Sequence, residues 1–222
     1  MLEILIVDAE LQLVPAEMHG DKQIRKLAVE RGKRPEDLLL DSNFMHSSIE
    51  RYFPGRSNRM GRPDIFHMLM NVALESILNK EKKLKLNIHT VQGKFIRVNP
   101  DTRIPKSYNR FVGLVEKLLQ KGKIEAPDGK VLMNLEKISL KDHLNDGMHN
   151  ILLSPDGFQV KSSKLPFDER DARIIIGGFS EGKFVSDFSG INETYSIFNE
   201  ELTIWTVASE CIASYERYLN LQ

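Results

Sequence analysis

Cysteine is nearly absent from this chain of 222 residues, and so are the long apolar runs that would mark a membrane protein. The one cysteine, Cys211, excludes an intramolecular disulfide and fits a reducing compartment. No stretch approaches the roughly 18 apolar residues of a membrane span. The apolar start MLEILIVDAE carries acids instead of the basic residues of a signal peptide. We therefore expect a cytoplasmic protein that makes no contact with a membrane.

Several motifs of nucleotide, metal and nucleophile chemistry are missing as well. The sequence has no GxxxxGK followed by Ser or Thr, no GxGxxG after a strand and no GxSxG turn. Its six histidines form no HExxH and there is no cysteine pair, so we expect no zinc or other metal site. Cys211 falls in the middle of an apolar helical stripe, where a small buried hydrophobe is the simplest interpretation. These absences exclude a P-loop, a nucleophile elbow and a zinc centre.

The net charge is zero, but this average hides a segregation of charge along the chain. Residues 1–50 carry 6 Lys/Arg and 10 Asp/Glu, a net of −4. Residues 51–123 carry 16 and 5, a net of +11, and residues 124–222 carry 9 and 16, a net of −7. A basic middle between acidic flanks predicts a cationic surface for a polyanion. The alternative is a fold that interleaves the three segments and mixes their charges in space.

Strand and helix patterns alternate, which predicts one α/β domain over residues 1–222 with a largely parallel sheet flanked by helices. The expected strands cover residues 2–14, 84–90, 94–98, 130–138, 150–154, 172–179 and 194–198. The expected helices cover residues 21–32, 63–80 and 107–122, a C-terminal stripe from 204 to 219, and one or two short helices within 33–53. The run ARIIIGGF is almost continuously apolar, which is typical of a strand buried on both faces.

Two loops punctuated by proline concentrate positive charge. They are FPGRSNRMGRPD and VNPDTRIPKSYNRF. In the second loop the cations are spaced i, i+3, i+7, which would place them on one face of a helix. The cations of the two loops are Arg56, Arg59, Arg62, Arg103, Lys106 and Arg110.

A glycine turn follows the buried strand. Gly177 and Gly178 end the run IIIGGF, and Gly182 follows shortly. Ligands of open α/β sheets bind outside the carboxyl ends of strands, and paired glycines let a ligand approach bare backbone. A tight turn without a ligand accounts for this motif equally well.

Three segments together carry a resemblance: GRPDIFHMLMNVALESILNK, VNPDTRIPKSYNRFVGLVEKLL and IIIGGFSEGKF. They are similar to the pseudouridine-N1-specific small-subunit ribosomal RNA methyltransferases, a family of ribosome biogenesis enzymes in the SPOUT superfamily. The similarity runs from about residue 62 to residue 190 and, more weakly, through the C-terminal helix. Its specific part is RPD before a buried helix, combined with VNPxxRIPxxxxRF.

The resemblance implies a trefoil-knotted α/β fold, a homodimer, S-adenosylmethionine as methyl donor and a pseudouridine of small-subunit ribosomal RNA as acceptor. It divides the chain into an N-terminal extension (1–50), an inserted basic RNA-binding part (51–123) and a knotted cofactor-binding part (124–222). The family's cofactor-binding loops correspond here to Leu153, Gly177, Gly178, Gly182, Ile197, Leu202 and Thr203.

Asp64 is the candidate catalytic residue. Pseudouridine keeps a hydrogen on ring N1, so methyl transfer to this atom needs alignment and loss of a proton, but no covalent nucleophile and no metal. Asp64 would orient the N1–H or accept its proton; the alternative is an acid in the first helical turn, stabilised by the helix dipole. Arg62 would contact a phosphate or pair with Asp64. Glu75, in the same expected helix, is either a buried acid with a raised pKa or simply paired.

The remaining candidates concern RNA. A base that reaches the cofactor must be extruded at a cost of a few kcal/mol, which contacts to phosphates repay. Tyr108 stacks on a base in one interpretation, whereas Tyr108 and Phe111 are core anchors in the other. The expected RNA contacts are Arg103, Lys106 and Arg110 as a phosphate clamp, with Arg62 and Arg59 as further contacts. A non-catalytic ribosomal-RNA-binding assembly factor is the alternative function.

Overall fold

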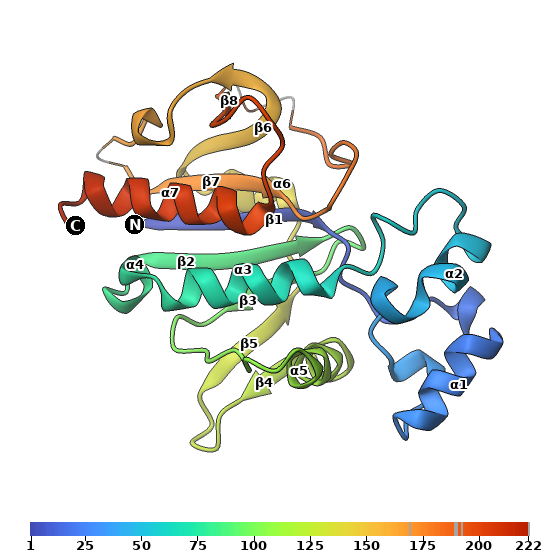
Figure 1. Cartoon of the computed structure of the whole chain (residues 1–222). Coiled ribbons are helices and arrows are strands. Elements are labelled where there is room, and N and C mark those ends of the chain that lie inside the picture. Colours follow the sequence, from blue (N-terminus) through green and yellow to red (C-terminus); the bar gives the residue numbers. More distant parts are fainter. Residues whose placement is uncertain (169, 189–190, 192, 222) are drawn as a thin grey trace.

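Eight strands form one sheet in the part of the chain that the computed structural model describes, residues 1–168, 170–188, 191 and 193–221. Residue 190, where the stronger part of the family resemblance ends, lies outside these ranges. The strands are β1 (Leu2–Ala9), β2 (Leu84–Thr90), β3 (Phe95–Val98), β4 (Lys123–Glu125), β5 (Val131–Glu136), β6 (His149–Gln159), β7 (Ala172–Gly177) and β8 (Thr194–Ser196). Their order across the sheet is β4-β5-β3-β2-β1-β7-β6-β8 (Figure 1).

The sheet has a parallel and an antiparallel part. Parallel pairings join β2, β1, β7, β6 and β8, and β3, β5 and β4 extend this sheet by antiparallel pairings. The hairpin predicted across Gln92 and Gly93 joins β2 to β3. The predicted α/β class with a largely parallel sheet is confirmed. The short strand β4 was not predicted from the sequence.

β1 lies at the centre of the sheet because both of its faces are apolar. Leu2 and Ile4 belong to the larger core on one face, and Leu5 and Val7 belong to a smaller core on the other. All eight of its residues are buried, as expected for a strand covered on both sides. The segment 1–50, predicted as an extension, is thus divided between this central strand and a helical subregion.

The α-helices are α1 (Lys22–Glu30), α2 (Ser42–Tyr52), α3 (Pro63–Glu75), α4 (Ile77–Lys80), α5 (Tyr108–Lys121), α6 (Leu140–Leu144) and α7 (Ile204–Tyr218). α3 begins at Pro63 as predicted, since proline needs no amide donor at this position. The helix predicted through residue 80 is interrupted at Ser76, whose ψ of 156° is extended and whose hydroxyl caps α4. α6 was not predicted from the sequence.

α3 and α7 lie side by side over one face of the sheet (Figure 1). The predicted stripe of α7 is confirmed, and its buried members Ala208, Cys211 and Ile212 join the main core with α3. The apolar side chains of this stripe are therefore covered within the chain, so the stripe does not by itself indicate a dimer. Cys211 is fully buried, which confirms its interpretation as a small hydrophobe, and this burial raises the pKa of its thiol. Among the described residues, every helix is too short or too polar to cross a membrane.

α1 and α2 form a helical subregion beside the end of the sheet at which β1 finishes (Figure 1). It has a core of its own, which includes Met18, Ile24, Met45 and Ile49. The loop from α2 to α3, residues 53–62, returns the chain from this subregion to the sheet. This loop carries three of the predicted cations to the edge where the parallel strands end.

Candidate active site

A pocket of about 450 Å³ opens beside the middle of β6 and the ends of β7 and β8. Five of the seven predicted cofactor residues line it: Leu153, Gly177, Gly182, Ile197 and Leu202. The pocket wall consists of the middle of β6, the segment 179–184 after β7, the segment that follows β8, and the first turns of α7. The three loops that the resemblance assigned to the cofactor therefore meet at one place.

The lining is apolar at its floor and acidic at its rim. Ile176 and Ile204 are buried floor residues. The charged residues of the lining are Asp156, Glu181, Glu200, Glu201 and Lys183. Four carboxylates against one lysine attract a cationic ligand, and an apolar floor accepts a planar ring.

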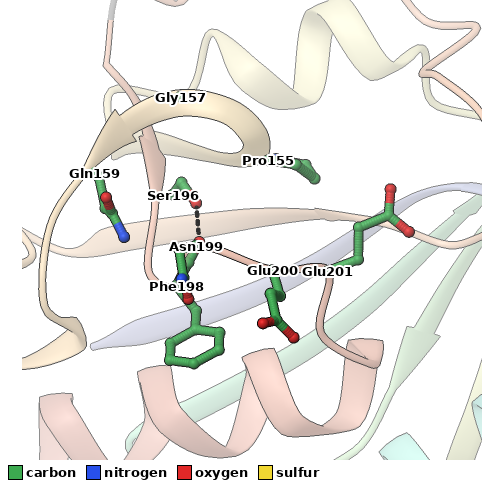
Figure 2. Close-up of a pocket in the computed structure, with 8 residues that line it drawn as sticks. All are labelled: Pro155, Gly157, Gln159, Ser196, Phe198, Asn199, Glu200 and Glu201. Carbon is green, nitrogen blue, oxygen red and sulfur yellow. Dashed lines mark hydrogen bonds between the residues drawn. The ribbon is translucent and has the colours of Figure 1, made fainter.

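A smaller hollow of about 300 Å³ adjoins this pocket and shares five lining residues with it: Pro155, Ser196, Phe198, Glu200 and Glu201. Figure 2 shows this hollow, where Ser196 donates a hydrogen bond of 2.6 Å to the carbonyl oxygen of Phe198. The bond fixes the turn that leads the chain from β8 to the two glutamates. The smaller hollow is thus an outer extension of the same site.

The two remaining predicted cofactor residues are outside the lining in the described part of the chain. Gly178 packs directly on β1: a Cβ at this position would lie 2.7 Å from Ala9 Cα. Its amide donates to the carbonyl of Val7 at 2.6 Å, and its carbonyl accepts from Glu10 at 3.3 Å. Thr203 precedes α7 and is exposed. Gly178 therefore shapes the pocket from below.

Asp8 anchors the loop that follows β7 and was missed by the sequence reasoning. It is buried and has a φ of 57°, in the left-handed region that few residues other than glycine adopt. Its carboxylate accepts hydrogen bonds from the amides of Val185 and Ser186 and from the Ser186 hydroxyl, at 2.6–3.0 Å. An acid directly after an apolar strand, as in LIVDAE, was the available signal.

Arg62 and Asp64 lie together at the start of α3. Arg62 donates from Nε and Nη2 to the two oxygens of Asp64, at 2.9 and 2.8 Å. The hydrogen bond from its guanidinium to Asp64 raises the pKa of Arg62. Both side chains are about a third exposed, with 28% and 32% of their surface accessible. The pairing that the sequence offered as one alternative for Arg62 is present.

The buried Asp41 and the half-buried Tyr108 add a hydrogen-bonded pair to this region, and Asp41 was not predicted. The Tyr108 hydroxyl donates to Asp41 Oδ2 at 2.7 Å. Burial raises the pKa of Asp41, and the nearby charge of Asp64 raises it further. Burial and the bond to Asp41 also raise the pKa of Tyr108. Tyr108 and the fully buried Phe111 are therefore core anchors, the second of the two predicted alternatives.

The predicted phosphate clamp is arranged differently from a single helical face. Arg103 and Lys106 lie in the loop before α5, and Arg110 lies in α5. All three are exposed. Among the residues that the structure describes, Arg103 and Arg110 have no hydrogen-bond or ion-pair partner, whereas Lys106 donates to Asn71 Oδ1 at 2.9 Å.

This loop is held against α3 by a histidine. His67 Nε2 lies 2.8 Å from the carbonyl oxygen of Pro105, and its ring stacks on Phe111 with centroids 4.8 Å apart.

Glu75, further along α3, is exposed and pairs with Lys80 at 3.0 Å. The hydrogen bond from Lys80 lowers the pKa of Glu75. The buried-acid alternative for Glu75 is wrong, and the paired alternative holds.

Arg59 is largely buried, with 12% of its side chain exposed. Its Nε donates to Glu10 Oε1 at 3.1 Å, and its Nη1 donates to the backbone of the segment after β7. The predicted RNA contact thus lies beside this pocket and already has partners within the chain.

A second cluster of charged side chains lies at the opposite end of the parallel strands. In the described part of the chain, Glu3, His143 and Asp146 are the one group with the spacing of metal ligands. Arg173 is fully buried and donates to Glu3 at 2.7 Å and to Asp146 at 2.5 Å. Burial raises the pKa of Glu3, but the hydrogen bond from His143 and the charge of Arg173 outweigh it and lower the pKa. A fixed cation already balances these acids, so we interpret the cluster as structural.

Comparisons with known proteins identify the family of the chain. The family model described as EMG1/NEP1 methyltransferase matches residues 4–216. The chain is 49% identical over 223 residues to the ribosomal RNA small subunit methyltransferase Nep1 of Thermoplasma acidophilum, and 48% identical over 224 residues to that of Thermoplasma volcanium; each match covers 100% of both chains. The crystal structure of Archaeoglobus fulgidus Nep1 bound to S-adenosylhomocysteine matches with a TM-score of 0.86 and 32% identity over 98% of both chains. The chain therefore belongs to the EMG1/NEP1 methyltransferase family.

Proposed function

We propose that this protein transfers a methyl group from S-adenosylmethionine to N1 of a pseudouridine in small-subunit ribosomal RNA. The observation that carries the proposal is the pocket with an apolar floor and an acidic rim, beside the loop from α2 to α3 with its exposed cation Arg56. The two Thermoplasma relatives bear the name of small-subunit ribosomal RNA methyltransferases. An assembly factor that only bound RNA would not need such a pocket.

The pocket fits the proposed cofactor. Its floor at Ile176 and Ile204 suits the adenine ring, and its acidic rim suits the cationic sulfonium and amino groups. Gly177 lines the pocket without a side chain, and the Phe179 ring packs against it: a Cβ at this position would lie 2.7 Å from that ring. When bound, S-adenosylmethionine supplies a methyl group that is electrophilic because it is attached to a positively charged sulfur.

The side chains around the start of α3 provide the acceptor side of the reaction. Arg62 keeps the Asp64 carboxylate in one orientation, and both remain accessible to RNA. In the proposal Asp64 accepts a hydrogen bond from the pseudouridine N1–H and takes its proton during the transfer. Arg103, Lys106 and Arg110 hold phosphates and so offset the cost of base extrusion. Cys211 plays no part, because it is fully buried.

The homodimer, the trefoil knot and a cytoplasmic location belong to the same proposal. Large apolar side chains are exposed near the pocket rim: Phe158, Val185 and Phe198, with 75%, 68% and 50% of their surface accessible. A second copy that covered them would stabilise the dimer by burying apolar surface. Light scattering at micromolar concentration tests this part: we expect twice the monomer mass of 25.4 kDa.

Two synthetic RNA hairpins that differ in a single base test the reaction. One carries pseudouridine at the target and the other carries uridine; each is incubated with the protein and a cofactor labelled in its methyl group. We expect label in the pseudouridine hairpin alone, because N1 of uridine carries the glycosidic bond and has no proton to lose. Equal labelling of both hairpins contradicts the N1 assignment. RNA binding without any labelling supports the assembly-factor alternative.

A further inference from the structure

The side chain of Arg59 joins the loop between α2 and α3 to the loop that follows β7. Its Nη1 donates to the carbonyl oxygens of Glu181 and Lys183, at 3.0 and 2.9 Å. Its guanidinium carbon lies 4.1 Å from the centroid of the Phe179 ring, within the range of a cation–π interaction. Phe179, Glu181 and Lys183 all line the cofactor pocket, so one guanidinium contacts three alternate residues of its wall.

Glu10 holds this guanidinium in place from the other side. Its carboxylate is buried, and Oε1 accepts from Arg59 Nε at 3.1 Å and from Arg56 Nη2 at 2.9 Å. A buried carboxylate is costly without a compensating cation, so the pair persists once formed. Arg56 is 46% exposed and, among the described residues, makes no side-chain bond to the segment after β7. The two arginines therefore share Glu10 but differ in their contact with the pocket wall.

The pocket wall is built around the guanidinium. Gly182 has a φ of 89°, and a Cβ at this position would lie 2.8 Å from Arg59 Nη1. The close approach thus depends on a residue without a side chain. Beside it, the Ser180 hydroxyl donates to the carbonyl oxygen of Asn58 at 2.5 Å. A side chain of each loop therefore donates hydrogen bonds to backbone carbonyls of the other loop.

We infer that Arg59 is a positioning residue, which fixes residues 179–183 in the form that receives the cofactor. The inference rests on the proposed function, because it concerns the same pocket. A loop that is ordered before binding loses less conformational freedom when the ligand arrives, so its affinity for the ligand is higher. Arg59 is thereby assigned to the cofactor side of the site, whereas its sequence pattern indicated a phosphate contact.

The test compares Arg59→Gln with its matched control Arg56→Gln. We expect the dissociation constant for S-adenosylhomocysteine, measured by calorimetry, to rise by up to about 10²-fold in Arg59→Gln and to stay unchanged in the control. RNA affinity without cofactor should be equal in both variants and in the wild type. At saturating cofactor the kcat of Arg59→Gln should recover, because the defect lies in the KM for the cofactor. Arg59→Lys keeps the charge but lacks the planar guanidinium with its Nε and Nη1 donors. It should therefore restore less than half of the affinity for S-adenosylhomocysteine that Arg59→Gln loses.

Hydrogen exchange makes the test independent of the reaction. In the protein without cofactor, Arg59→Gln should speed exchange of the amides of residues 178–186 and leave β1 and β7 unchanged. This result would stand even if the wild type failed to bind S-adenosylhomocysteine, an outcome that would sink the proposed function alone. Unchanged exchange in this loop would overturn the inference, and so would faster exchange throughout the sheet. A normal affinity for S-adenosylhomocysteine together with a salt slope for RNA reduced by about 0.7–0.9 would assign Arg59 to a phosphate instead.

Discussion

Arg62 and Asp64 form a two-point ion pair at the first turn of α3, with both guanidinium-to-carboxylate bonds below 3 Å. Such paired bonds fix the plane of the carboxylate relative to the guanidinium. Each oxygen of Asp64 keeps a lone pair that Arg62 does not use. Because both side chains remain partly accessible, the carboxylate is fixed in orientation and still open to a ligand.

Asp64→Asn should lower kcat by about 10²–10⁴-fold, the range typical of a general base. The amide keeps the shape of the carboxylate but cannot take a proton at neutral pH. Affinities for RNA and S-adenosylhomocysteine should stay close to those of the wild type. Glu75→Gln is the matched control, because it removes an exposed, paired acid from the same helix and should leave kcat unchanged. Full turnover by Asp64→Asn would reduce this residue to a stabilising acid at a helix start.

Replacement of Arg103, Lys106 and Arg110 by alanine should weaken RNA binding and flatten its dependence on salt. Each phosphate contact that is lost removes roughly 0.7–0.9 from the slope of log K against log salt. Filter binding at several salt concentrations measures this slope. Lys123→Ala is the control, because this lysine lies on β4 and pairs with Glu125. If the triple variant keeps the wild-type slope, the three cations serve another surface.

The order of strands and helices could be predicted because it depends on local periodicity. The apolar alternation of residues 84–90 and the proline at 63 act within a few residues, and both features hold in the structure. The loops predicted to bind the cofactor were assigned through the resemblance, and five of their seven residues line one pocket. The single helical face predicted for the three cations is not present, because the segment before α5 is a loop that packs on His67.

Pairings between distant residues could not be predicted from the sequence. Arg173 lies in an otherwise apolar strand, and its partner Glu3 is 170 positions away. Glu10 and Arg59 are 49 positions apart and meet only because the loop after α2 returns to the end of β1. No local pattern marks such a pair. The same reason explains why Arg59 looked like a phosphate contact in its own loop.

Glu3→Gln should destabilise the protein by about 3–5 kcal/mol at neutral pH, because it removes one partner of a buried ion pair. In the folded state the pKa of Glu3 is lowered from its ordinary value of 4.5, so its contribution to stability is present above pH 4.5 and is lost as the pH falls through the folded pKa. Wild type and variant should therefore approach one another in acid. Urea unfolding at neutral pH and at a pH well below 4.5 measures the difference. A constant difference across this range would contradict the assignment.

Two glycine substitutions should change stability in opposite directions. Gly178→Ala places a Cβ within 2.7 Å of Ala9 Cα and 2.8 Å of an Ile6 methyl group, so β1 and the segment after β7 must separate. Overpacking of this kind costs about 1–3 kcal/mol, and the shift should also weaken binding of S-adenosylhomocysteine. Gly113, inside α5, has open space around its Cβ position, so Gly113→Ala should stabilise the protein by about 0.4–1 kcal/mol. Denaturant unfolding of both variants measures the two signs. If Gly178→Ala is as stable as the wild type, the backbone around Gly178 and β1 accommodates the added Cβ at little cost. Any loss of affinity for S-adenosylhomocysteine in that variant would then indicate direct contact between Gly178 and the cofactor.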